Sequence, residues 1–190
     1  MSDVKNEGAG GAWTTFEAEA MPHMPRLFRL AMWLERNRSE AEDLVQETLM
    51  QALKSFHRFT PGTNCRAWLV TILYHVRSNR IRARSRVVLV PDENHFIAET
   101  VPIAPSIPDR LTDEEVLGAL RDLPEAHQQL ILLCDIEELT YREAAAALSI
   151  PIGTVMSRLH RARALLREAL AHLADTMVAP AAVATVDRQG

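Results

Sequence analysis

The sequence predicts an all-α protein in which two small helical domains are joined by an extended linker. Apolar residues recur at spacings of three and four in both halves of the chain, which is the period of amphipathic helices. Turn and helix-start patterns separate these segments, and the one β-like run, Val87 to Val90, lies alone. Four prolines within residues 87–110 break every helical pattern and favour an extended linker there.

Composition excludes several classes of protein before any motif is considered. The 190 residues have a formal net charge of −4 and are 47% hydrophobic, a normal globular balance. No apolar run is long enough to span a membrane, and the N-terminus does not resemble a signal peptide. Cys65 and Cys134 lie far apart and outside any metal-ligand spacing, so we expect reduced thiols in a cytoplasmic protein without metal or cofactor. The histidines are scattered with no nucleophile spacing, which argues against an enzyme.

The first domain is expected to span residues 17–86, behind a flexible leader of residues 1–16. Its first helix is predicted from about Glu17 to Trp33. Ser39 and Glu42 have the S-x-x-E form of a capping box and predict the start of a second helix. That helix should bury one face, formed by Ala41, Leu44, Val45, Thr48, Leu49, Ala52, Leu53 and Phe56.

A third helix with a basic side follows the turn from Thr60 to Asn64. Asn64 is its expected N-cap, and Trp68 is expected in the core rather than on a stacking surface. Between Arg66 and Arg86 there are six arginines and no acid. The helix therefore offers a candidate surface for phosphates, which the acidic charge of the whole chain conceals.

The second domain, residues 111–173, is predicted to contain a helix-turn-helix. A short helix ends at the turn from Ser149 to Pro151, and a longer basic helix follows. Residues 174–190 are expected to form a flexible tail. Two capping boxes mark helix starts in this domain: Thr112 with Glu115, and Thr140 with Glu143.

The basic helix after Pro151 carries no acid for sixteen residues, whereas solvated helices usually mix both signs. Its buried stripe is expected at Ile152, Val155, Leu159, Ala162, Leu166 and Ala169. The opposite face carries Ser157, His160 and Arg161, flanked by Thr154, Met156, Arg158 and Arg167. The first turns of a helix in the major groove reach base edges, and arginine can bridge two acceptors of guanine. The pattern therefore indicates DNA contact.

Four segments in collinear order resemble the extracytoplasmic-function (ECF) sigma factors, a subfamily of the sigma-70 family. The recognition helix of their region four resembles PIGTVMSRLHRAR, and the start of that region resembles LPEAHQQLILLCDIEELTYREAAAAL. Their region-two core-binding helix resembles AEDLVQETLMQAL, and their promoter-melting helix resembles GTNCRAWLVTILYHVRSNRIR. Each motif alone is moderately specific, but four in the right order from about Pro25 to Leu170 are a strong match.

The resemblance implies an alternative sigma factor that binds core RNA polymerase, directs it to promoters and opens the duplex without catalysis of its own. Docking on the clamp helices of the largest subunit would involve Asp43, Leu44, Gln46 and Glu47. Minus-10 recognition and melting would involve Asn64, Arg66, Tyr74, Arg77, Asn79, Arg80 and Arg82. Minus-35 recognition by the helix-turn-helix, residues 140–163, would involve Thr154, Met156, Ser157, Arg158, His160, Arg161 and Arg163. The apolar stretch from Leu130 to Ile136 should be mostly core, with some contact to the polymerase β flap.

The resemblance also implies an anti-sigma factor as a partner and a stress regulon as the target. The linker acids Asp92, Glu93 and Glu99 would suit polymerase channels that later hold nucleic acid, although a solvated tether is equally compatible with them. Cys65 departs from the family's base-capturing loop, and an unreactive small residue is the simpler interpretation. Two other functions stay open: a helix-turn-helix regulator that binds duplex DNA without polymerase, and a sigma-like decoy that sequesters an anti-sigma protein.

Overall fold

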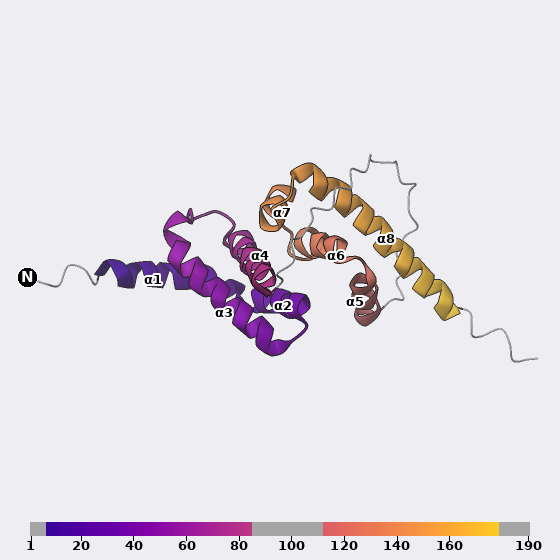
Figure 1. The fold of residues 1–190 in the computed structure, drawn as a ribbon, viewed down its shortest axis with the longest axis horizontal. Coiled ribbons are helices and arrows are strands. Elements are labelled where there is room, and N and C mark those ends of the chain that lie inside the picture. Colours follow the sequence, from indigo (N-terminus) through magenta and orange to yellow (C-terminus); the bar gives the residue numbers. More distant parts are fainter. Residues whose placement is uncertain (1–6, 85–111, 179–190) are drawn as a thin grey trace, which may run out of the picture. The chain divides into compact units, whose positions relative to one another are not determined.

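The computed structural model describes residues 7–84 and 112–178, and every regular element in these two ranges is helical (Figure 1). The prediction of an all-α fold is therefore confirmed. The linker, the run from Val87 to Val90 and the end of the expected tail lie outside the described residues. The described helices form two compact units.

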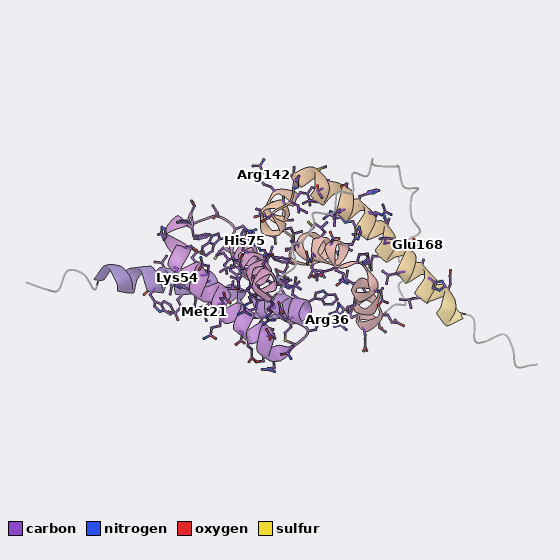
Figure 2. The ribbon with its side chains drawn as sticks, in the orientation of Figure 1. Met21, Arg36, Lys54, His75, Arg142 and Glu168 are labelled. Carbon is purple, nitrogen blue, oxygen red and sulfur yellow. The ribbon has the colours of Figure 1, made fainter. Side chains whose placement is uncertain are left out.

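The first unit is built on three helices that pack against one another, α2, α3 and α4 (Figure 1). Fully buried leucines at its centre, Leu44, Leu69 and Leu73, come from α3 and α4. Lys54, labelled in Figure 2, lies in the last turn of α3, where a cation is favoured by the helix dipole. The elements of this unit are α1 (Glu7–Ala20), η1 (Met21–His23), α2 (Met24–Glu35), α3 (Arg38–Ser55), η2 (Phe56–Arg58), α4 (Cys65–Arg84) and α7 (Tyr141–Leu148).

The N-terminal helix begins earlier than predicted and is interrupted. Helix α1 starts at Glu7, inside the expected leader, and a 3-10 turn separates it from α2. Pro22 and Pro25 lie in the first turns of η1 and α2. Proline lacks the N–H that an interior helical position needs but is tolerated in a first turn. The prediction of one continuous helix from Glu17 to Trp33 was therefore wrong.

An aromatic cluster fixes α1 to the rest of the first unit. Phe16 is 3% exposed and meets Phe56 edge-on at a ring separation of 5.3 Å. Phe59 stacks on Phe56 at 5.6 Å and lies 5.0 Å from Trp68. Such ring pairs add to the free energy gained from burial alone. Trp68 packs within this cluster and is partly buried, so its predicted place in the core is confirmed in part.

The start of α3 differs from the predicted capping box. Asn37 is the N-cap, since its Oδ1 accepts a hydrogen bond from the backbone N–H of Glu40 at 3.2 Å. Ser39 lies inside the helix, and Glu42 pairs with Arg38 at 2.8 Å instead of closing a box. Asparagine is as good an N-cap as serine, so the earlier residue takes the position.

The turn before α4 has the geometry that its sequence predicts. Gly62 has a φ of 82°, a left-handed conformation that glycine adopts without strain, and Thr63 N–H donates to the Thr60 carbonyl at 3.2 Å. Asn64 then caps α4, because its Oδ1 accepts from the Ala67 N–H at 3.1 Å. The predicted N-cap is confirmed.

Helix α7 packs against α4 within the first unit. The Asn64 Nδ2 donates to Glu143 Oε1 at 3.1 Å, so the cap of α4 is joined to the capping box of α7. The Nε2 of His75, labelled in Figure 2, lies 3.3 Å from the Ala146 carbonyl and 3.4 Å from the Ser149 hydroxyl. Asn64, a candidate DNA-binding residue, thus already has two hydrogen-bond partners.

The second unit contains α5 (Asp113–Asp122), α6 (Glu125–Ile131), a π-helical segment, η3 (Leu132–Ile136), and α8 (Ile152–Val178). Helices α5 and α6 both pack against α8. Both predicted capping boxes, at Thr112 and Thr140, are confirmed. Helix α8 continues beyond the predicted end of the domain into the expected tail.

The buried stripe of α8 matches the prediction at Val155, Leu159 and Ala162, whereas Leu166 and Ala169 are only partly buried and the unpredicted Leu170 is buried. Val155, Leu159 and Ala162 are at most 1% exposed, and Leu170 continues the stripe. Ile152 was predicted to be buried, but 47% of it is exposed. It is the first residue of the helix, where the stripe has not yet reached the packed surface, so that prediction was wrong.

Candidate nucleic-acid interface

The candidate minus-10 residues of α4 differ widely in exposure. Asn64, Asn79 and Arg82 are exposed, while Arg66, Arg77 and Arg80 are partly buried. Tyr74 is only 3% exposed and lies in the core. Its position four residues after Val70, which is also buried, was a signal for this placement. The side chain of Tyr74 therefore supports the surface from beneath, and its burial is the physical reason that it does not form part of it.

Arg77 ties α4 to the end of α2. Its Nε donates to Glu35 Oε1 at 3.2 Å, and its Nη2 donates to the Leu34 carbonyl at 3.4 Å. The two side chains are only 15% and 16% exposed. A partly buried, hydrogen-bonded pair of this kind is costly to separate. Arg77 is thus positioned by the fold itself.

The last turns of α4 carry two arginines that pair with carboxylates of α3. Arg80 Nε donates to Glu47 Oε2 at 2.7 Å, and its Nη2 donates to the Asp43 backbone carbonyl at 2.9 Å. One turn further on, Arg84 Nη2 donates to Glu40 Oε2 at 2.8 Å. We call Glu40, Glu47, Arg80 and Arg84 the α3–α4 ion-pair cluster.

The pKa shifts of Glu40 and Arg84 agree with their pairing in the cluster. The hydrogen bond from Arg84, together with its charge, lowers the pKa of Glu40 below its ordinary value. The same hydrogen bond and the charge of Glu40 raise the pKa of Arg84. Neither Glu40 nor Arg84 was among the predicted site residues. Their spacing was the available signal, because Arg84 follows Arg80 by four residues and Glu40 precedes Glu47 by seven.

The candidate polymerase-docking residues lie on α3 beside the cluster. Asp43, Gln46 and Glu47 are exposed, but Leu44 is fully buried. Leu44 was also predicted for the buried face, and burial is what the structure has, so its side chain cannot offer contact area to a partner. A shallow cleft of about 480 Å³ borders these residues, lined by Glu40, Asp43, Gln46, Glu47, Met50, Arg80 and Arg84.

The candidate minus-35 residues lie on the side of α8 that is away from its buried stripe. Met156, Ser157, His160 and Arg161 are exposed. Met156 is 54% exposed, an unusual fraction for a large apolar side chain. The Ser157 hydroxyl donates to the Thr154 carbonyl at 3.2 Å, so it turns back on its own helix. Four exposed side chains over two turns thus share one surface of the basic helix.

The flanking residues of α8 are engaged within the second unit. Arg163 makes two hydrogen bonds to the Asp135 carboxylate, one of them 3.1 Å long. Arg158 is partly buried, and His127 of α6 lies near enough to sense its charge. Burial lowers the pKa of His127, and the charges of Arg161 and Arg158 lower it further. His127 and Asp135 were not predicted, because their neighbours are far away in the sequence.

Neither cysteine has the environment of a reactive thiolate. Cys65 is buried at the start of α4, and desolvation, with a contribution from the charge of Glu19, raises its pKa to about 11. Burial likewise raises the pKa of the Cys134 thiol. Thiols with raised pKa values are poor nucleophiles at neutral pH. The unreactive interpretation of Cys65 is thereby favoured.

The described residues contain neither a metal-binding cluster nor a membrane-spanning helix. Within residues 7–84 and 112–178, no three His, Cys, Asp or Glu side chains are placed to hold a metal ion. In the same ranges, no helix combines the length and apolar character needed to cross a membrane.

Families of known proteins match both halves of the sequence. Residues 20–87 match the family model for sigma-70 region 2, and residues 113–173 match that for sigma-70 region 4. The ECF RNA polymerase sigma factor SigE of Mycolicibacterium smegmatis is 34% identical over 175 residues, covering 89% of this chain and 67% of the relative. EcfG of Rhodopseudomonas palustris, also an ECF sigma factor, is 37% identical over 143 residues, covering 75% of this chain and 78% of the relative.

A solved structure with a similar fold agrees with these relatives. It is that of the sigma factor RpoE of Bartonella quintana in complex with the anti-sigma factor NepR, which is 35% identical to this chain. The similarity has a TM-score of 0.62 and covers 83% of this chain and 97% of RpoE. Because its sequence matches regions 2 and 4 in order and closely resembles these relatives, the chain belongs to the ECF subfamily of the sigma-70 family of RNA polymerase sigma factors.

Proposed function

We propose that this sigma factor carries core RNA polymerase to promoters that it reads with two separate helices. The observation that carries the proposal is the presence of two arginine-bearing helices, α4 and α8, one in each family region. Helix α8 enters the major groove at the minus-35 element, where Met156, Ser157, His160 and Arg161 meet base edges. Thr154, Arg158 and Arg163 contact the phosphates.

Helix α4 binds the minus-10 element and stabilises its melted strand. A melting surface must prefer single-stranded DNA to the duplex, and basic groups along the backbone contribute to that preference. Asn79 and Arg82 are exposed on the last turns of α4, Arg80 is partly buried beside them, and Asn64 and Arg66 lie at the start of the helix. Arg77 and Tyr74 hold the helix in place. The acidic surface of α3, with Asp43, Gln46 and Glu47, docks on core polymerase.

The protein acts in the cytoplasm and catalyses no reaction of its own, because the active site for RNA synthesis belongs to the polymerase. An anti-sigma factor is its expected inhibitor, by analogy with RpoE of Bartonella quintana, which was solved bound to NepR. A helix-turn-helix regulator that works without polymerase would leave the arginines of α4 without a role. A decoy for an anti-sigma protein would need neither set of DNA-facing residues.

In vitro transcription with core polymerase on a genomic promoter library tests the proposal. We expect transcripts from a limited set of promoters when the protein is added to core, and none of them from core alone. Tight, specific duplex binding by the free protein without such transcripts would favour the regulator. Binding of an anti-sigma protein without core binding would favour the decoy.

A further inference from the structure

The α3–α4 ion-pair cluster joins two surfaces that the proposed function assigns to different partners. Glu47 belongs to the surface that docks on polymerase, and Arg80 belongs to the surface that contacts DNA. In the structure they form one ion pair, 2.7 Å long, although they are 33 residues apart in the chain. A carboxylate that binds a cation of polymerase is no longer fully available to Arg80, so the two surfaces are electrostatically coupled.

The geometry allows the partners of these side chains to be exchanged. Glu40, Asp43 and Glu47 recur at three and four residues on α3, and Arg80 and Arg84 lie four apart on α4, so each set lines one helix face. One partner of each pair is open to solvent, Glu47 at 52% and Arg84 at 63% exposed, while Arg80 is 21% and Glu40 is 39% exposed. Exposed pairs are weak and can be replaced at little cost.

The cleft beside the cluster indicates which partner binds there. It is lined by three α3 carboxylates, by Arg80 and Arg84, which pair with two of them, and by Met50, which is 54% exposed. A partner segment with cationic side chains and an apolar face would pair with the carboxylates and cover the methionine. Nucleic acid is excluded from these carboxylates by its own charge. The occupant is therefore a cationic segment of core polymerase, and the DNA strand contacts only the arginine side.

We propose that the α3–α4 ion-pair cluster is an exchange site through which polymerase docking prepares α4 for DNA. Cations of the polymerase take Glu47 and Glu40 as partners, and Arg80 and Arg84 are released to bind phosphates. This inference rests on the proposed function, because it requires α3 to face the polymerase. Before docking, the carboxylates compete with DNA for the arginines, which weakens DNA binding by the free protein.

Linkage makes the exchange reciprocal, and this supplies the first test. If Arg80 competes with polymerase for Glu47, then Arg80→Gln must tighten core binding, by about two- to fivefold for an exposed pair. Arg82→Gln is the matched control, since it removes the same charge from the same helix. Its guanidinium bonds to the Ser78 carbonyl and to Asn79, both on α4. Both variants should weaken promoter binding by the holoenzyme, but only Arg80→Gln should raise the affinity for core.

The second test removes the competing carboxylate instead. Glu40→Gln should strengthen binding of the free full-length protein to a fluorescein-labelled, mixed-sequence single-stranded DNA. Glu42→Gln is its control, because it neutralises a carboxylate on the same helix that pairs with Arg38 rather than with α4. A gain in DNA affinity that both variants share reflects the loss of one negative charge. Only the additional gain for Glu40→Gln reflects the release of Arg84. Circular dichroism melting of each variant verifies that it is folded.

The outcomes separate the exchange site from the proposed function. If wild type binds core and yields promoter-specific transcripts, tighter core binding by Arg80→Gln alone and an excess gain for Glu40→Gln support the exchange. Unchanged or weaker core binding by Arg80→Gln, or equal gains for Glu40→Gln and Glu42→Gln, overturn the exchange and leave the proposed function intact. Failure of wild type to bind core overturns both.

Discussion

The two arginine-rich helices, α4 and α8, are held in different electrostatic surroundings. On α4, Arg77, Arg80 and Arg84 each pair with a carboxylate of α2 or α3. On α8, the exposed turns carry Met156, Ser157, His160 and Arg161, and the ion pair with Asp135 involves Arg163, at the edge of that surface.

The difference matches the two tasks proposed for the protein, recognition of duplex DNA by α8 and binding of a melted strand by α4. Reading a duplex groove needs an accessible surface that is ready before the DNA arrives. Binding a melted strand is useful only after polymerase is in place, so arginines held by neighbouring carboxylates suit a surface that should act late. Four changes test the contrast between the exposed side chains of α8 and the ion-paired arginines of α4.

Leu44→Ala tests whether α3 is anchored through the core. Leu44 is fully buried, so the truncation should lower the free energy of unfolding by about 2–5 kcal/mol. Chemical denaturation measures the loss, with Gln51→Ala on an exposed position of the same helix as control, expected within about 0.5 kcal/mol of wild type. A change no larger than that of the control would mean that Leu44 is a surface residue after all.

Arg161→Ala tests the accessible surface of α8. We expect minus-35-dependent promoters to lose about 1–3 kcal/mol of holoenzyme binding, with core affinity unchanged. Promoter filter binding and core pull-down measure the two effects. Loss of core binding would place Arg161 in the wrong interface.

The salt dependence of DNA binding compares the two helices directly. Arg158→Ala should lower affinity across all sequences and reduce the salt slope of the holoenzyme by about one, because each phosphate contact releases about one counterion. In the free protein, Arg80→Gln should change the slope less than Arg158→Ala does, since Glu47 already neutralises Arg80. Titrations of nonspecific DNA at several salt concentrations provide the slopes, and equal changes would contradict the occupied state of α4.

The smallest expected effect concerns the pKa of His127, which responds to the positive charges on α8. Its pKa is lowered in the folded protein, so the unfolded chain binds the proton more readily and the second unit should lose stability as pH falls below about 6.5. His127→Gln should reduce that loss of stability, which urea unfolding measures at pH values above and below about 6.5. By NMR titration, Arg158→Ala should raise the pKa of His127, whereas Arg163→Ala, whose charge Asp135 balances, should raise it less.

Local patterns in the sequence were sufficient for much of the fold. The capping boxes at Thr112 and Thr140 and the Asn64 cap depend on residues within a few positions, and each is confirmed, while the stripe of α8 is confirmed at Val155, Leu159 and Ala162. The start of α3 was missed because two good caps, Asn37 and Ser39, lie two residues apart, and cap propensity does not separate them.

The site was predictable as a set of residues but not as a set of pairs. Residue types and family motifs pointed to Arg80 and to Glu47 separately, and no local rule joins positions 33 residues apart. Leu44 and Tyr74 were assigned to surfaces through the resemblance, although helical spacing already placed Leu44 on the buried face. Burial follows from packing, so periodicity was the better guide there.

A double-mutant cycle between Glu47 and Arg80 tests the exchange most directly. Wild type, Glu47→Gln, Arg80→Gln and the double variant are compared for binding to single-stranded DNA, first as free proteins and then with saturating core polymerase. We predict a coupling energy of about 0.2–1 kcal/mol in the free protein that disappears in the holoenzyme, because docking separates the pair. The same coupling in both states would show that the pair survives docking, and would contradict the account.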